Sequence, residues 1–203
     1  EYWTKRDIDG WRLDVPNEID DDSFWQDFRR RVKAINPEAY IVGEIWDNPE
    51  RWLKGDQFDG VMNYPFRKAV MQYLFDENPI STGEFCEKVR SAFPENRFGT
   101  PMNLLGSHDT TRIASQPRTS PERIRLALAL LFFMPGAPCI YYGDEIGMQG
   151  MADPWNRAPM DWEHADETMR GAVKALLNQR LNTPMLQTGW LTVETDGPDT
   201  LIV

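Results

Sequence analysis

The feature that most limits the possible folds is a short apolar run that carries a carboxylate at or near its end and occurs three times. The runs are residues 9–15, 40–46 and 102–109, and their acids are Asp14, Glu44 and Asp109. Helix-like segments separate the runs, as in a chain that returns repeatedly to one parallel sheet. Because the carboxyl ends of parallel strands meet at one rim, this arrangement predicts an α/β barrel with its site at that rim.

The first run contains two charges that need an explanation. Arg12 and Asp14 lie two residues apart, so both side chains project from the same face of a strand, toward the interior. Leu13 and Val15 then point the other way, into packing. Burying two charges costs several kcal/mol unless they pair. The two residues are therefore either a structural ion pair or part of a reactive site, and the recurrence of acids favours the second.

Composition sets the broad class of the protein. Of the 203 residues 41% are apolar and eight are Trp, which predicts a folded globular protein. The formal net charge of -10 predicts no nucleic-acid partner and no anionic membrane as partner, because binding to phosphates needs a basic surface. Cys86 and Cys139 have neither disulfide nor metal-ligand spacing. The sequence shows no signal peptide and no membrane span, and we expect a cytoplasmic protein without a cofactor.

Periodicity and cap residues predict alternating strands and helices. Ser23 with Gln26, and Ser81 with Glu84, have the spacing of capping boxes. The expected helices cover residues 23–35, 49–53, 65–74, 81–93, 121–133 and 167–181, and the expected strands cover residues 9–15, 40–46, 58–63, 102–105 and 138–143. The loop at 144–162 is long enough to suggest a function.

These elements make five strand-helix units, whereas a closed barrel needs eight. We therefore expect a partial (β/α)8 TIM barrel, about strands 4 to 8, within residues 1–185. Residues 186–203 are expected to begin a C-terminal β domain. The chain is accordingly expected to be a piece of a longer protein.

Three short motifs carry a resemblance to a known enzyme family. Residues 10–14, 43–44 and 107–109, in that order, resemble motifs of the α-amylase superfamily of glycoside hydrolases. Residues 136–145 are similar to that family's motif on its last barrel strand. Residues 15–18 are similar to the signature of the neopullulanase, cyclomaltodextrinase and maltogenic amylase subgroup, with Pro where Ala is more usual.

The resemblance implies a role for each matching residue. Asp14 would be the nucleophile, Glu44 the general acid/base, and Asp109 the carboxylate that distorts the sugar and stabilises the transition state. Arg12 would keep Asp14 ionised, and His108 would hydrogen-bond the sugar at the cleavage point.

Five further residues would bind substrate. Asn17 and Glu18 belong to the subgroup signature. Asp153 and Arg157 would contact the glucose on the non-reducing side, and Trp46 would form a stacking surface on the leaving side.

The implied activity is retaining hydrolysis of α-1,4 or α-1,6 glucosidic bonds in cyclodextrins, pullulan, starch or maltooligosaccharides. Such chemistry needs one protonated carboxyl and one charged carboxylate, about 5 to 5.5 Å apart. Arg12 would favour the charged form of Asp14, whereas Trp46 and negative neighbours would favour the neutral form of Glu44.

Three alternatives remain open at this point. The three acids could hold Mg²⁺, although Arg12 would stand in the way of the ion. A non-catalytic family member would be expected to lose acids that are all present here. The chain alone lacks the family's third-strand motif, which predicts weak glucan binding without turnover, and an open barrel edge predicts self-association. The family's usual calcium ligands lie largely upstream, so calcium is possible only in a longer protein.

Overall fold

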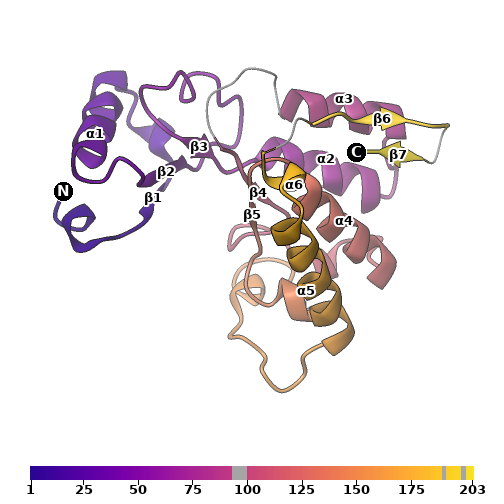
Figure 1. The fold of residues 1–203 in the computed structure, drawn as a ribbon. Helices are drawn as coiled ribbons and strands as arrows, with labels where there is room; N and C mark the ends of the chain where they lie inside the picture. Colours follow the sequence, from indigo (N-terminus) through magenta and orange to yellow (C-terminus); the bar gives the residue numbers. More distant parts are fainter. Residues whose placement is uncertain (93–99, 189–190, 198–199) are drawn as a thin grey trace. The chain divides into compact units, whose positions relative to one another are not determined.

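The computed structural model describes residues 1–92, 100–188, 191–197 and 200–203 (Figure 1). These residues form two compact units. The first contains residues 1–64 and 100–102, and the second contains residues 65–92 and the described residues from 103 onward. Among the helices of these described ranges, none is both long and apolar enough to cross a membrane.

The first unit is built on a parallel three-stranded sheet with the order β1-β2-β3. Its elements are the 3-10 helices η1 (Thr4–Arg6) and η2 (Pro16–Glu18), the strands β1 (Gly10–Leu13), β2 (Tyr40–Gly43) and β3 (Gly60–Val61), and the helix α1 (Asp22–Ile35). α1 is the crossover between β1 and β2, and it buries Trp25 and Val32 in the same core as Ile41 of β2. Parallel strands joined by a crossover helix are what the sequence predicted here.

The helix α1 begins at a different cap from the predicted one. Asp21 is the N-cap residue, and its Oδ1 accepts hydrogen bonds from the backbone N–H groups of Ser23 at 2.9 Å and Phe24 at 3.2 Å. The predicted capping box of Ser23 and Gln26 is therefore wrong. A carboxylate at the N-cap satisfies two free N–H groups and also complements the positive end of the helix dipole.

Further elements of the first unit differ from prediction, and among them β3 covers only Gly60–Val61 of the expected 58–63. The expected helix at 49–53 is a turn, in which Trp52 is buried and stacks on Phe58 with ring centroids 5.1 Å apart. The strand expected to reach Trp46 ends at Gly43. The apolar run continues beyond the strand because Ile45 packs into the core as part of the following loop.

The second unit is mainly helical. Its elements are the helices α2 (Tyr64–Leu74), α3 (Thr82–Ala92), α4 (Pro121–Phe133), α5 (Glu167–Asn182) and α6 (Met185–Thr188), the paired strands β4 (Met102–Leu104) and β5 (Ala137–Cys139), the 3-10 helices η3 (Ile113–Ser115), η4 (Asp144–Ile146) and η5 (Trp155–Arg157), and the strands β6 (Glu194–Thr195) and β7 (Leu201–Ile202). α4 and α5 pack together (Figure 1). Phe66 of α2, Phe85 of α3 and Phe132 of α4 meet in one buried core.

The cap predicted for α3 is confirmed, and α4 begins at the residue that the sequence predicted. The backbone N–H of Glu84 donates to Ser81 Oγ at 3.2 Å, and the N–H of Ser81 donates to Glu84 Oε2 at 3.1 Å, which is a complete capping box for α3. Ser120 Oγ accepts from the N–H of Arg123 at 3.3 Å and caps α4. Residue 93, the last of the helix predicted at 81–93, lies outside the described residues.

The C-terminal residues form an antiparallel hairpin of β6 and β7 that packs against α3. Val193 is buried in the same core as Phe85 of α3. The helix α6 crosses the boundary predicted at residue 185, and a separate C-terminal β domain stays a prediction.

Candidate active site

The first group of candidate residues gathers at the carboxyl ends of β1 and β2. Leu13 pairs with Gly43 in the parallel register, so Asp14 and Glu44 follow neighbouring strands at the same level. The N–H of Glu44 also donates to the carbonyl of Leu13 at 2.9 Å. The two acids therefore lie at one edge of the sheet, as the sequence predicted.

Arg12 connects the two carboxylates. Its Nη1 pairs with Asp14 Oδ1, and its Nη2 lies 2.9 Å from Glu44 Oε2. The Glu44 side chain is only 4% exposed, whereas the Asp14 side chain is 76% exposed. The predicted burial of Asp14 on an interior face is thus not found in this unit, because β1 ends one residue earlier, at Leu13.

Val15 was expected to pack into the core, and this prediction is wrong. The residue is exposed and adopts a left-handed backbone with φ of 32°, a region that β-branched residues rarely occupy. Its N–H donates to Glu44 Oε2 at 3.0 Å. The turn thus supplies a second donor to the oxygen that Arg12 already contacts.

The surroundings of Glu44 differ from the negative neighbours that the sequence suggested. Besides Arg12 and Val15, the indole Nε1 of Trp46 lies 3.3 Å from Glu44 Oε1. The Trp46 ring stacks on Tyr64 with centroids 3.7 Å apart, yet it remains 44% exposed. It therefore keeps surface available for a ligand next to Glu44.

Gly43 and the residues after the turn complete the first group. A Cβ on Gly43 would lie 2.6 Å from the ring of Phe58, so a glycine must precede Glu44. Asn17 and Glu18 are exposed on the short helix η2 that follows the turn at Val15.

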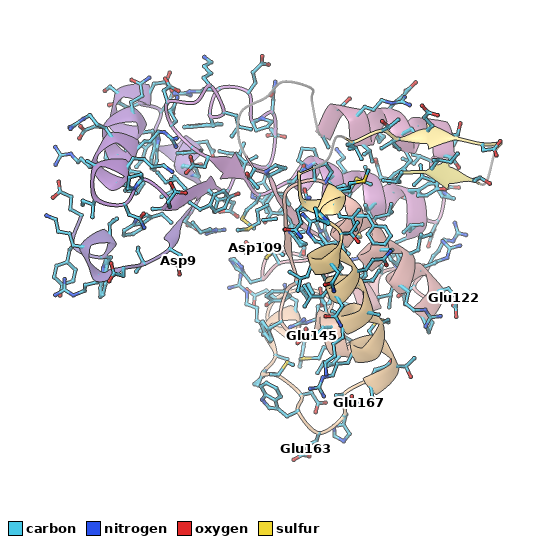
Figure 2. All side chains as sticks on the ribbon, viewed as in Figure 1. Asp9, Asp109, Glu122, Glu145, Glu163 and Glu167 are labelled. Carbon is cyan, nitrogen blue, oxygen red and sulfur yellow. The ribbon has the colours of Figure 1, made fainter. Side chains whose placement is uncertain are left out.

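The second group lies on two loops of the second unit. Asp109, labelled in Figure 2, follows β4, and each of its two carboxylate oxygens contacts a nitrogen-bearing side chain. His108 Nε2 lies 3.0 Å from Asp109 Oδ2, and Arg157 Nη2 lies 3.0 Å from Asp109 Oδ1. Arg157 Nε is also 3.5 Å from Asp153 Oδ2. Four residues that the sequence singled out are therefore joined in one charged cluster.

A buried ion pair beneath these loops was missed at the sequence level. Arg112 is fully buried, and its Nη1 lies 3.0 Å from Asp144 Oδ1 and donates to the carbonyl of Tyr142 at 2.6 Å. Burial raises the pKa of Asp144 to about 7, and the neighbouring Arg112 opposes this rise. A Cβ on Gly106 would lie 2.9 Å from Asp144 Oδ2, so a glycine is needed there.

No sequence pattern identified Arg112 and Asp144 as partners. They are far apart along the chain; Arg112 lies in a loop and Asp144 begins the short 3-10 helix η4, where a charged residue is ordinary. Asp144 belongs to the motif at 136–145, which is the signal that could have prompted a search for a buried counter-ion.

The described residues also bear on the metal alternative. Within them, no group of three or more His, Cys, Asp or Glu side chains is placed to hold a metal ion. The cation that contacts both Asp14 and Glu44 is the guanidinium of Arg12, which is the objection that the sequence raised against Mg²⁺.

Comparison with known proteins gives the family. The alpha-amylase family, described as "Alpha amylase, catalytic domain", matches residues 1–189. A cyclomaltodextrinase from Bacillus sp is 41% identical over 204 residues, which cover 96% of this chain and 36% of that protein. Neopullulanase 2 from Thermoactinomyces vulgaris is 46% identical over 169 residues, which cover 82% of this chain and 28% of that protein.

A solved structure agrees with these relatives. The ligand-free cyclic alpha-maltosyl-(1-->6)-maltose hydrolase from Arthrobacter globiformis is 36% identical, with a TM-score of 0.93 over 98% of this chain and 46% of that one. The chain thus spans less than half the length of these relatives. It belongs to the alpha-amylase catalytic-domain family, whose members are built on a TIM barrel.

Proposed function

We propose that this chain supplies the reacting carboxylates of a retaining α-glucan hydrolase. Asp14 is the nucleophile, Glu44 is the general acid/base, and Asp109 stabilises the transition state. The observation that carries the proposal is the bridge of Arg12 between Asp14 and Glu44 at the ends of adjacent parallel strands. The resemblance of the motifs around all three acids to those of the family supports the same roles.

The two bridged acids differ in exposure, and the proposal gives each a separate role. Asp14 is exposed and paired with a cation, so its charged oxygen can reach the anomeric carbon and form a glycosyl ester as the glycosidic bond breaks. Glu44 is enclosed beside Trp46, where it gives a proton to the leaving oxygen. Glu44 then takes a proton from the water that hydrolyses the ester, which restores both carboxyls.

The second group supplies recognition of the sugar. Arg157 offers donors and Asp153 offers acceptors, a combination that suits the paired hydroxyls of glucose. His108 and Asp109 provide a further donor and acceptor. The proposed substrates are the α-1,4 or α-1,6 glucosidic bonds of cyclodextrins, pullulan, starch or maltooligosaccharides, in line with the names of the relatives.

A hybrid enzyme tests this proposal. In it, the present chain replaces the matching segment of the Bacillus cyclomaltodextrinase, because the chain covers only 36% of that protein. We expect the hybrid to hydrolyse β-cyclodextrin, and the relative rates with pullulan and starch to give its substrate preference. A hybrid that folds like the unaltered Bacillus enzyme but hydrolyses none of the three would contradict the proposal.

For the 203-residue chain alone we propose weak glucan binding, no turnover and self-association. β1 is an edge strand of its sheet, and Tyr2 and Trp3 are 59% and 57% exposed close to it in sequence. Exposed strand edges and aromatic surface favour association. Light scattering should show species larger than a monomer, and maltotriose should stay intact. A clean monomer that hydrolyses maltotriose would refute both expectations.

A further inference from the structure

Asn156 links the two loops that carry the second group of candidate residues. It is the middle residue of η5, and its side chain is buried while Trp155 and Arg157 on either side are exposed. Its Nδ2 donates to the carbonyl of His108 at 2.8 Å and to the carbonyl of Thr110 at 3.1 Å. These are the two residues that flank Asp109.

The orientation of Asn156 is fixed from several directions. Two carbonyl acceptors require the NH₂ end of the amide to face the loop, since only that end can donate. The backbone carbonyl of Asn156 accepts from the hydroxyl of Tyr141 at 3.1 Å. Its backbone N–H donates to the carbonyl of Ala152 at 3.3 Å. Asn156 is thus anchored independently of Asp109.

The turn that carries Asp109 is closed by hydrogen bonds of its own. The N–H of Ser107 donates to Thr110 Oγ1 at 2.9 Å, and the N–H of Thr110 donates to the carbonyl of Ser107 at 3.2 Å. The N–H of Asp109 donates to Ser107 Oγ at 3.2 Å. The two hydrogen bonds from Asn156 are therefore not needed to shape the turn. They fix the position of the turn relative to η5.

The location matters because η5 also carries Arg157. The Arg157 guanidinium lies 3.0 Å from Asp109 Oδ1. Asn156, the preceding residue of the same short helix, binds the backbone carbonyls on both sides of Asp109. A shift of η5 or of the turn would change both contacts together.

We infer that Asn156 is a positioning residue that sets the place of the Asp109 carboxylate against Arg157 and His108. Its importance for catalysis rests on the proposed function of Asp109. A group that stabilises a transition state must be held within about 0.5 Å of its working position. Misplacement by about 1 Å costs on the order of 100-fold in rate.

The first test is NMR spectroscopy of the full chain, which contains two His. His108 contacts Asp109, whereas His164 contacts Asp161 at 3.1 Å and serves as an internal control. We expect Asn156→Ala to shift the ring signals of His108, because the turn would keep its own hydrogen bonds but change its location. The ring signals of His164 should stay in place.

The matched variant is Asn103→Ala. Asn103 is also fully buried, and its Nδ2 donates to the carbonyl of Pro135 at 2.6 Å. This variant should lower the melting temperature without moving the His108 signals. Unchanged His108 signals in Asn156→Ala, or an equal shift in Asn103→Ala, would overturn the inference. If Asn156→Ala does not fold, Asn156→Ser keeps one donor and should still shift the His108 signals away from those of the unaltered chain; unchanged signals in it would overturn the inference.

Kinetics of the hybrid enzyme separate this inference from the proposed function. Asn156→Ala should lower kcat by between about tenfold and 100-fold, with KM changed by less than about twofold. If Asp109→Asn keeps full kcat, the proposed role of Asp109 fails. The NMR result then still decides whether Asn156 positions the Asp109 carboxylate. If Asp109→Asn is inactive but Asn156→Ala keeps wild-type kcat and His108 signals, the positioning role fails alone.

Discussion

Replacing Asp14 by Asn in the hybrid enzyme is expected to lower kcat for β-cyclodextrin by about 10⁴-fold or more, because the amide cannot form the glycosyl ester. The effect on folding should be small. The Asp14 side chain is 76% exposed, and an exposed ion pair such as the one with Arg12 contributes at most about 1 kcal/mol. Steady-state kinetics together with thermal unfolding of the same preparations measure both expectations.

Two further variants define what the Asp14 result means. Asp9→Asn removes an exposed carboxylate directly before the first residue of β1, at the end of the strand opposite to Asp14. This variant should keep full activity. Glu44→Gln should also abolish hydrolysis, since the acid/base is lost while Arg12 and Val15 can still contact the amide oxygen. Turnover that survives Asp14→Asn, or falls equally in Asp9→Asn, would remove Asp14 from its assigned role.

Replacing Arg112 by Met is expected to destabilise the second unit by about 3 to 5 kcal/mol at pH 8. The Arg112 side chain is fully buried, and it holds both Asp144 and the carbonyl of Tyr142. Without it, the buried Asp144 carboxylate loses the cation that is hydrogen-bonded to it. Urea unfolding of the chain, followed by circular dichroism, measures the loss.

The destabilisation by Arg112→Met should depend on pH. Burial raises the pKa of Asp144 to about 7 in the folded state, against an ordinary value of 3.8. The folded protein therefore binds a proton between about pH 4 and pH 7 that the unfolded chain releases. The stability contributed by this proton is complete at low pH and is lost as the pH rises through about 7. At pH 5 the neutral Asp144 needs no counter-ion, so Arg112→Met should cost much less there.

A surface pair provides the matched control. Arg125 lies 3.2 Å from Glu122 on the exposed side of α4, and Arg125→Met should change the free energy of unfolding by less than about 1 kcal/mol at either pH. An Arg112→Met variant that is no less stable than Arg125→Met, or that loses the same free energy at pH 5 and pH 8, would show that Arg112 does not compensate a buried charge.

The fold could be predicted from the sequence where local signals determine the element. The capping box of Ser81 and Glu84 and the start of α4 after Ser120 depend on neighbouring residues alone. The cap of α1 was misplaced because acids at 20–22 precede Ser23, and the sequence does not say which of them accepts the N–H groups. The turn at 49–53 could not be foreseen, since it follows from the stacking of Trp52 on Phe58.

The part of the candidate site that lies at the ends of strands could be predicted from the sequence. The register of β1 and β2 places Asp14 beside Glu44, and the sequence predicted that these strands end at one rim. The left-handed turn at Val15, the amide of Asn156 and the Arg112–Asp144 pair depend on loops that meet in three dimensions. Loop conformation leaves no periodic pattern in the sequence, so the contacts of these residues could not be predicted from it.

The measurement that tests the account most directly is the capture of the glycosyl ester. The hybrid enzyme would be treated with a 5-fluoro maltosyl fluoride, which forms the ester faster than water removes it, and then digested for peptide mass spectrometry. We predict one maltosyl adduct, on the peptide that contains Asp14, and no adduct in Asp14→Asn. An active hybrid that gives no adduct, or an adduct on another carboxylate, would contradict the assignment of Asp14 as the nucleophile.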